Sequence, residues 1–389
     1  MMNTKTIAIA VVAIFIIAGA GTFIFMNSGD EGGDGDLVTA TQIISRVNTD
    51  GSGIYVKTEY KDVKFFDDNN KPIKEAWDTK VFGTPGTAAI QHVQLQDMVR
   101  GVGLNFVKFD GNKSKGNVYY IDNVTNADAA TTKVADQLDG GILWEPQYSK
   151  IVADDKYFGL ITTNELFPGH TCCVIAGSEG FLKNNADAAT AFLAGYIKGV
   201  GWINKALADD KSDEYKQLVE ICKTYTTGLT DDIIAKALSI VKYTYADDET
   251  GSLSVLKDDI AKLETSLTES GNILKPITSY GFKDSTEFAN VFVNDTYLKK
   301  AISGENVKLS EKKTVRVALI DGDIHQIVIR VAMDLGYFDE YNVKVVTHAI
   351  QKGPSVALEV VQGKETDLGF VGAPPITINT VNSEGGIHR

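Results

Sequence analysis

Cysteine is scarce in this sequence, and its spacing excludes two common roles. Only three cysteines occur among 389 residues, with Cys172 and Cys173 adjacent and Cys222 far from both. This pattern fits neither a disulfide framework nor a zinc motif built from paired Cys-x-x-Cys sequences. We therefore expect no metal and no cofactor, and we interpret the adjacent pair as one strand with a side chain on each face.

Positive charge is also in short supply. The chain has 38 Lys and Arg residues against 51 Asp and Glu residues, a formal net charge of −13. This sign opposes binding to nucleic-acid phosphates, so nucleic acid is excluded as a partner. Hydrophobic residues at 43% and charged residues at 23% are close to the globular average, so the chain can bury a core. Its length corresponds to about two or three domains.

The longest apolar run lies near the N-terminus. Lys5 precedes residues 7–26, which carry no charge and are long enough to span a bilayer. The run continues past the small residues at 18–21 that resemble a cleavage site, which favours an uncleaved membrane anchor over 1–26. Acidic and glycine-rich residues then predict a flexible tether over 27–41. The charge asymmetry places the soluble body on the extracytoplasmic side of the cell membrane.

From residue 42 onward, strand-like and helix-like segments alternate, which is typical of an α/β fold. The segment 205–300 is predicted to be mainly helical, with Thr230 as an N-cap before two aspartates. Strands are predicted at 105–109, 141–144 and 170–176, and a short strand that runs into a glycine turn over 80–87. Helices are predicted around 127–138 and where apolar residues recur at helical spacing, at Leu95, Met98, Val99 and Val102 and at Ala189, Phe192, Leu193, Tyr196 and Val200.

A polar linker at 301–314 precedes a second α/β run. A βαβαβα order of this kind is typical of the beginning of a doubly wound domain, yet here it lies at the end of the chain. Strands are predicted at 315–320, 343–347 and 367–371, alternating with helices around 328–335, at 354–362 and from 373 onward.

Six segments together resemble one family. They are VRVALIDGDIHQIVIRVAMDLGYFDEYNVKVV at 315–346, GKETDLGFVGAPP at 363–375, GSGIYVK at 51–57, KVFGTPGTAAIQH at 80–92, GGILWEP at 140–146 and FLKNNADAATAFLAGYIKG at 181–199. The chain is similar to the periplasmic solute-binding proteins of ABC importers, in the nitrate, sulfonate, taurine and thiamine-precursor branch. The resemblance implies a two-lobed α/β fold of the periplasmic-binding-protein type II class, with a ligand between the lobes and permease subunits as partners.

The order of these segments departs from the family pattern, in which the 315–389 segment comes first. This order predicts a circular permutation, with 315–389 packed beside 42–57 in one sheet. Lobe I would then comprise 42–80 and 178–389, and lobe II 81–177. Two alternatives remain: the segment completes a neighbouring chain in a segment-swapped dimer, or the chain is a fragment of a longer tandem array.

Glycine-rich loops at the carboxyl ends of strands are where such a fold presents backbone N–H groups to an anionic ligand. Each candidate also has a structural interpretation: the glycines as turn residues, Trp144 as a hinge-packing aromatic and Glu145 as a structural hydrogen-bond partner. No catalytic residue is expected, because the sequence shows no base near the cysteine pair. The predicted ligand-binding residues are His325, Gln326, Gly372, Ala373, Ser52, Gly53, Thr84, Gly86, Thr87 and Trp144.

Three functions compete on these grounds. The leading hypothesis is a membrane-tethered receptor that captures a small, anionic organic solute by lobe closure and delivers it to an importer, without chemistry. The second is a sensor or degenerate binding protein that has lost transport. The third is an enzyme resembling the thiamine-precursor synthases, which requires a cysteine- and histidine-rich active site that the sequence does not show.

Overall fold

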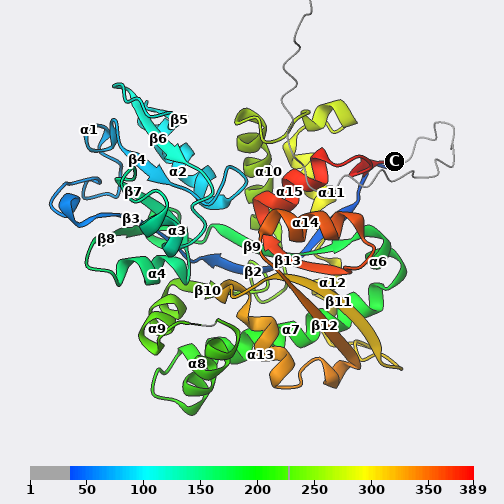
Figure 1. The fold of residues 1–389 in the computed structure, drawn as a ribbon. Coiled ribbons are helices and arrows are strands. Elements are labelled where there is room, and N and C mark those ends of the chain that lie inside the picture. Colours follow the sequence, from blue (N-terminus) through cyan, green and yellow to red (C-terminus); the bar gives the residue numbers. More distant parts are fainter. Residues whose placement is uncertain (1–35, 227) are drawn as a thin grey trace, which may run out of the picture. The chain divides into compact units, whose positions relative to one another are not determined.

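The strands gather into two separate six-stranded sheets in this computed structural model, which describes residues 36–226 and 228–389. The first sheet has the order β10-β2-β9-β13-β11-β12, and its antiparallel half from β10 to β13 joins a parallel half from β13 to β12 (Figure 1). Its strands are β2 (Thr41–Asp50), β9 (Thr171–Ser178), β10 (Val241–Tyr243), β11 (Lys313–Ile320), β12 (Val343–Ile350) and β13 (Leu368–Gly372).

The second sheet has the order β5-β6-β4-β7-β3-β8 and is also mixed. Strands β5, β6, β4 and β7 run parallel, while β3 is antiparallel to both of its neighbours. Its strands are β3 (Ser52–Lys57), β4 (Val81–Gly83), β5 (Asn105–Lys108), β6 (Asn117–Ile121), β7 (Gly140–Trp144) and β8 (Tyr157–Thr162). A short pair, β1 (Val38–Thr39) and β14 (Ile387–His388), joins the two ends of the described body.

Helices connect the strands, and local capping explains where several of them begin. The predicted N-cap is confirmed at Thr230, whose Oγ1 accepts a hydrogen bond from the Ile233 N–H. The helices are α1 (Lys74–Trp77), α2 (Ile90–Gly101), α3 (Ala127–Thr132), α4 (Gln147–Val152), α5 (Thr163–Leu166), α6 (Glu179–Asn184), α7 (Ala186–Leu207), α8 (Asp213–Tyr225), α9 (Asp231–Ile240), α10 (Ser254–Glu269), α11 (Ser285–Phe292), α12 (Thr296–Ser303), α13 (Ile327–Asp334), α14 (Gly353–Gln362) and α15 (Ala373–Asn382), with the 3₁₀ turns η1 (Thr58–Tyr60), η2 (Ile277–Tyr280), η3 (Ile324–Gln326) and η4 (Asp339–Tyr341).

The chain crosses between the sheets at Gly51 and again through residues 163–170. We define the second lobe as residues 52–162 and the first lobe as residues 37–50 and 171–388. These limits differ from the expected boundaries at 80/81 and 177/178, because β3 pairs in the second sheet and β9 in the first. The tether expected over 27–41 also ends earlier than predicted, because Val38, Thr39 and Thr41 belong to strands β1 and β2.

The C-terminal segment completes the first sheet. Strand β13 pairs with β9 and with β11, so the 315–389 segment lies in the same sheet as β2 and forms no separate domain. The expectation of one shared sheet therefore holds for β2 but not for β3, which lies in the second sheet. Whether this order arose by permutation remains a prediction.

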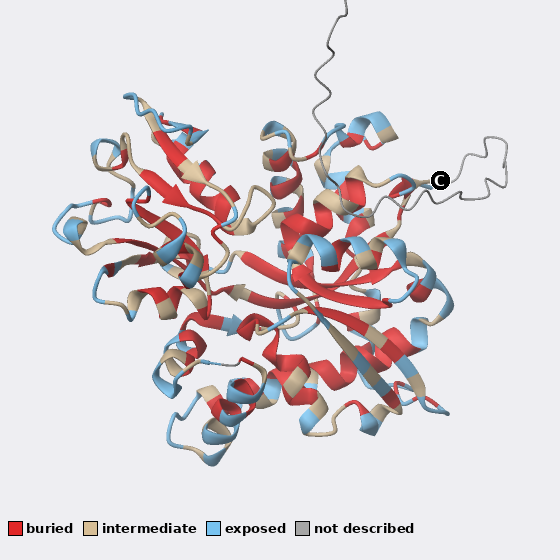
Figure 2. Ribbon diagram, in the orientation of Figure 1, coloured by how far each residue is buried: buried red, intermediate tan, exposed pale blue. Residues whose placement is uncertain are grey.

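Aromatic side chains anchor the core of each lobe. In the first lobe, Phe192 and Tyr196 of α7 meet the ring of Phe370 on β13 at centroid distances of 6.3 and 5.6 Å. In the second lobe, Trp77 stacks on Phe82 at 4.8 Å. Burial follows the strands and the helices that cover them, as the red segments of Figure 2 show. One hydrophobic cluster thus forms the core of the first lobe and two form that of the second, with Val93 and Ile240 each packing in a cluster of the opposite lobe.

The predicted anchor over 1–26 and most of the tether lie outside the described residues. Within the described part of the chain, no helix combines the length and the hydrophobicity needed to cross a membrane.

Candidate functional site

Gly51 carries the first crossover and fixes it to the opposite part of the first lobe. Its φ is +96°, and a Cβ at this position would lie 2.4 Å from His325 Nε2, so both the backbone and the space require glycine. The Gly51 carbonyl accepts hydrogen bonds from the Glu145 N–H at 2.9 Å and from His325 Nε2 at 2.8 Å. One carbonyl group therefore ties η3 and the end of β7 to the crossover.

His325 is buried among acidic and sulfur groups. Its backbone N–H donates to Asp323 Oδ1 at 3.0 Å, and its Nδ1 lies 3.7 Å from Cys172 Sγ. Burial acts to lower the pKa of His325, but the charges of Cys172 and Asp323 outweigh it and raise the pKa to about 10. Both ring nitrogens already contact protein groups, so His325 stabilises the first crossover.

Two predicted hydroxyl residues also have protein partners. Ser52 Oγ accepts a hydrogen bond from Gln91 Nε2 at 2.9 Å, and Thr84 Oγ1 lies 3.0 Å from His92 Nδ1. Burial lowers the pKa of His92 to about 4, which keeps its imidazole neutral at pH 7. These pairs connect β3 and β4 to α2 within the second lobe.

Gln326 is a structural residue of the first sheet. Its Oε1 accepts from the Ile320 N–H at 2.9 Å, and its Nε2 donates to the Phe370 carbonyl at 3.1 Å. The side chain thereby bridges β11 and β13 at their carboxyl ends, and both polar ends of its amide are occupied.

The six other predicted residues are buried to different degrees. Gly53 leaves room for the ring of Tyr148, which a Cβ would approach to 2.4 Å. Ala373 is buried and lines the cavity described next. The positions that remain partly exposed are Gly86, Thr87, Trp144 and Gly372.

A cavity of about 190 Å³ lies between the two lobes, beside the second crossover. Helix α2 of the second lobe forms one wall, α10 and the start of α15 form the other, and residues 167–171 of the crossover and the start of β9 close it. Because its walls belong to different lobes, its shape depends on the angle between them. Its lining includes Ile90, Val93, Gln94, Asp97, Phe167, His170, Thr171, Asp259, Ile260, Lys262, Leu263, Ser266 and Ala373.

Two buried polar atoms of this lining have no hydrogen-bond partner among the described residues: Gln94 Oε1 and His170 Nε2. The other ring nitrogen of His170, Nδ1, lies 2.9 Å from the Phe167 carbonyl and 3.2 Å from Asp50 Oδ1. Both neighbours are acceptors, so Nδ1 carries a proton. His170 Nε2 therefore accepts a hydrogen bond when the ring is neutral and donates one when it is charged. Buried unpaired polar atoms are rare and favour a partner in the cavity.

Charges around the cavity are unequally neutralised. Asp259 accepts from Thr171 Oγ1 at 2.7 Å and pairs with Arg46 at 3.6 Å. Burial raises the pKa of Asp97, although a hydrogen bond from Ser266 opposes the shift. Lys262 has no ion pair within the part of the chain that the structure describes. The one side chain of the lining that carries an unneutralised positive charge is therefore Lys262.

Glu145 has the structural role that its position in the sequence suggested. Its carboxylate accepts from the Ser149 N–H at 3.1 Å and from Ser149 Oγ at 2.9 Å, at the start of α4. Burial raises the pKa of Glu145 to about 7.

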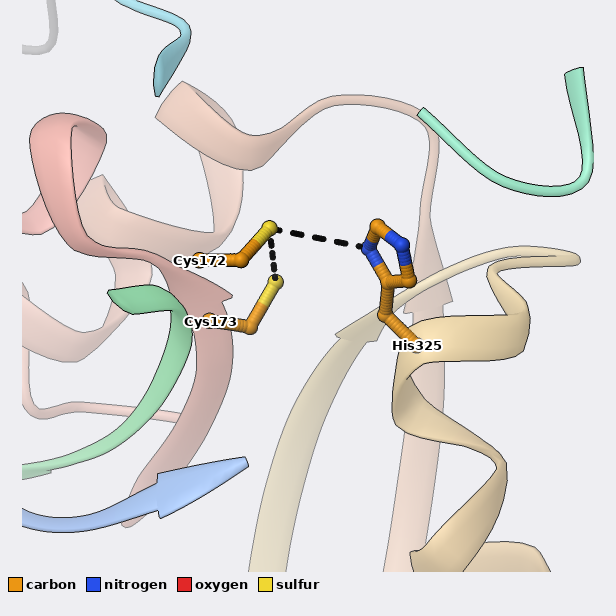
Figure 3. Close-up of side chains that lie close together, drawn as sticks. All are labelled: Cys172, Cys173 and His325. Atoms are coloured by element: carbon orange, nitrogen blue, oxygen red, sulfur yellow. Dashed lines mark hydrogen bonds between the residues drawn. The ribbon is translucent and has the colours of Figure 1, made fainter. Parts of the chain in front are cut away.

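The two adjacent cysteines are not separated by the sheet as expected. Their sulfurs lie 3.8 Å apart, and both point toward the imidazole of His325 (Figure 3). Irregular pairing between β2 and β9 next to Cys173 breaks the regular alternation of side chains. The structure also places a histidine beside the pair, which lies 153 residues away in the sequence.

A second cavity, of about 620 Å³, lies wholly within the first lobe. Its walls come from α7, α8, α9 and β10, and none of the predicted site residues lines it. Movement of one lobe against the other would leave this cavity unchanged, so it is the weaker candidate for a solute site that closes.

The arrangement defines a class of protein: a two-lobed α/β protein with a solute-sized cavity between its lobes. Residues 20–220, just over half of the chain, match the sequence model of the NMT1-like family. The chain therefore belongs to the NMT1-like family, and the family recognised from the sequence is confirmed. A search of curated proteins gives no match.

Several solved structures are similar to the chain at low identity. The periplasmic nitrate-binding protein NrtA from Synechocystis PCC 6803 is 18% identical, with a TM-score of 0.49 over 69% of each chain. The ligand-binding component of an ABC-type import system from Staphylococcus aureus, with zinc bound, is 16% identical, with a TM-score of 0.43 over 68% of this chain and 75% of that one. The alkanesulfonate-binding protein SsuA from Xanthomonas axonopodis pv. citri, bound to MOPS, is 15% identical, with a TM-score of 0.40 over 59% and 69%. All three are named as binding proteins and none as an enzyme.

Sequence reasoning missed Gln94, His170 and Lys262, the polar residues that best distinguish the cavity. Gln94 lies on the helix that the hydrophobic spacing predicts, but that spacing marks apolar residues and is silent on a polar residue facing another lobe. His170 was assigned to a strand, whereas β9 begins one residue later. His170 lies just before the strand with which the chain returns to the first lobe, and this position was the one signal that could have identified it.

Proposed function

We propose that this protein is an extracytoplasmic solute receptor, which captures a small, anionic organic molecule between its lobes and presents it to the permease of an ABC importer. It performs no chemistry on the solute. The soluble body is held at the membrane by the N-terminal segment, and nitrate, sulfonates, taurine and pyrimidine precursors are the solute classes to test.

The observation that carries the proposal is a pair of unpaired polar atoms on two side chains that line the interlobe cavity. Gln94 comes from the second lobe and His170 from the crossover, so a solute that bonds to both would link the lobes. Leaving such groups unpaired in a buried site costs about 1–3 kcal/mol each, which a bound solute or water removes. The rest of the lining contains apolar side chains such as Ile260 and Leu263, which suit the carbon part of an organic solute.

The preference for an anion rests on Lys262, which has no described ion pair. Of the two acids in the lining, Asp259 shares Arg46 with Asp247, and burial raises the pKa of Asp97. The net charge of −13 describes the whole chain and does not oppose this preference, because the field within a cavity is dominated by its nearest groups.

Five of the predicted residues keep a part in this proposal. Gly86, Thr87 and Trp144 of the second lobe and Gly372 of the first are partly exposed, and Ala373 lines the cavity. We assign these residues to contacts that form as the lobes close. The circularly permuted order is proposed as the origin of the C-terminal β11–β13 segment, and a sensor without a transport role remains the alternative function.

The test is a binding measurement on the full-length chain, purified in mild detergent because of the apolar segment at 7–26. Thermal unfolding and isothermal titration are measured with nitrate, alkanesulfonates, taurine, carboxylates and pyrimidines. We expect at least one anionic class to raise the melting temperature, because a ligand that binds only the folded state stabilises it. If no member of the panel does so, the transport proposal loses to the sensor.

A matched pair of variants tests the site. Gln94 Oε1 can only accept, so its partner is an N–H or O–H group of the solute. Gln94→Leu should raise the Kd about 2- to 10-fold, since such a hydrogen bond is worth about 0.5–1.5 kcal/mol. Gln96→Leu is the control: Gln96 lies on the same helix, is buried to the same degree and also has an unpaired Oε1, but it does not line the cavity. Equal effects of the two substitutions on the Kd would place the solute elsewhere.

A further inference from the structure

Cys172, Cys173 and His325 bring three metal-binding atoms together in the interior of the first lobe, next to both crossovers. The sulfurs lie 3.8 Å apart, Cys172 Sγ lies 3.7 Å from His325 Nδ1, and all three donor atoms fall within 4.8 Å of one another (Figure 3). All three residues are at least 96% buried. No role in the capture of the solute uses this cluster.

The distances match those of a tetrahedral zinc site. Zinc–sulfur bonds of about 2.3 Å and zinc–nitrogen bonds of about 2.0–2.1 Å place two sulfurs roughly 3.8 Å apart and a sulfur and a nitrogen roughly 3.6 Å apart. Two edges of the triangle, at 3.8 and 3.7 Å, thus have nearly the required length without a metal. The third edge, from Cys173 to His325, is no longer than 4.8 Å.

The imidazole is oriented as a metal ligand. A carbonyl oxygen can only accept, so the 2.8 Å contact with the Gly51 carbonyl assigns the proton of the neutral ring to Nε2. When the metal displaces the proton of Nδ1, the lone pair of that nitrogen faces the sulfurs. Metal-binding histidines usually donate their other ring N–H to a backbone carbonyl or a carboxylate in this way. Gly51 can hold this position only because it lacks a Cβ.

We propose that Cys172, Cys173 and His325 bind one Zn²⁺ ion, with water in the fourth position. Binding leaves both sulfurs as thiolates and the imidazole neutral, so the complex carries no net charge. Two protons are released, either one from each thiol or one from a thiol and one from His325. The two thiolate charges cancel the charge of the ion, which is what burial of a divalent cation requires. The ion would connect the start of β9, at the second crossover, to the residue that holds the first crossover.

The cluster follows the cavity directly along the chain. His170 and Thr171 line the interlobe cavity and immediately precede Cys172. None of the three ligands lines the interlobe cavity, so this metal site is distinct from the site of solute capture.

The experiment uses the full-length chain, reduced, freed of metal with a chelator and then titrated with ZnCl₂ and, separately, with CoCl₂. We expect one Zn²⁺ per chain by equilibrium dialysis with elemental analysis, and release of about two protons at a pH below the thiol pKa. Co²⁺ should give the intense absorption of a tetrahedral thiolate complex. Absence of stoichiometric binding, or Co²⁺ spectra without thiolate bands, would overturn the proposal.

Variants identify the ligands. Cys172→Ser, Cys173→Ser and His325→Gln should each weaken Zn²⁺ binding by at least about tenfold, and Gln keeps a donor for the Gly51 carbonyl. Cys222→Ser is the control, because Cys222 is equally buried but lies outside the cluster. Circular dichroism confirms that each variant is folded. Unchanged affinity in a folded ligand variant, or a disulfide between Cys172 and Cys173 that persists in reductant, counts against the site. Solute titration of the chelator-treated chain is a separate readout, so failure of either proposal is recognised independently.

Discussion

The substitution Gly51→Ala tests the crossover most directly. An alanine at φ +96° is strained by about 1–2 kcal/mol. Its Cβ would meet His325 Nε2 at 2.4 Å, so the buried bond to the Gly51 carbonyl must break or the ring must move, at a further cost of about 1–3 kcal/mol for the lost bond and about 1–3 kcal/mol for overpacking. We therefore expect a loss of at least about 3 kcal/mol in the free energy of unfolding.

Gly111→Ala is the matched control for that experiment. Gly111 has a φ of +99°, and no atom lies within 4 Å of its Cβ position, so only the backbone strain applies. Urea unfolding followed by tryptophan fluorescence gives both free energies. The reasoning fails if the two variants are destabilised equally within about 1 kcal/mol, because the contact with His325 would then contribute nothing.

Two further predictions concern pairs inside the lobes. The pKa of His92 is about 4 in the folded chain and 6.5 in an ordinary environment, so the unfolded state binds more protons between these values, and stability should fall by about 2 kcal/mol from pH 7 to pH 5. His92→Gln, which can still bond to Thr84, should lose this part of the pH dependence in urea titrations at the two pH values; an identical pH profile would contradict the assignment. Gln326→Leu leaves the Ile320 N–H and the Phe370 carbonyl without their side-chain partner, and thermal unfolding should show a loss of about 2–5 kcal/mol. A loss below about 1 kcal/mol would mean that the bridge between β11 and β13 is dispensable.

Local patterns in the sequence were enough to locate most elements of the first sheet. The strand expected at 343–347 is part of β12, and the helix expected at 354–362 is α14 with one more residue. The hydrophobic period and the glycine stops carry this information within a few residues of the chain. Strand β6 was missed, because its short sequence NVYYI lies between loops and lacks a clear alternation.

Long-range relations could not be inferred in the same way. The sequence shows Cys172 and His325 in two different segments, and only the pairing of β9, β13 and β11 brings those segments together. The lobe boundary was displaced for a similar reason. The local sequence of a strand such as β3 does not show in which of the two sheets it pairs. That choice depends on the neighbouring strands, which come from distant parts of the chain.

The segment order also bears on how the chain is made. The second lobe is continuous from 52 to 162, so all its strands are available once Thr162 has been synthesised. The first sheet instead waits for β13, which begins at Leu368, before β9 gains its second neighbour. At 5–20 residues per second, that interval is roughly 10–40 s. For that time β9 presents an open, hydrophobic strand edge, which is prone to pairing with other chains. The order of the segments therefore makes the second lobe the one that can fold first, and the first lobe the one that depends on protection during synthesis.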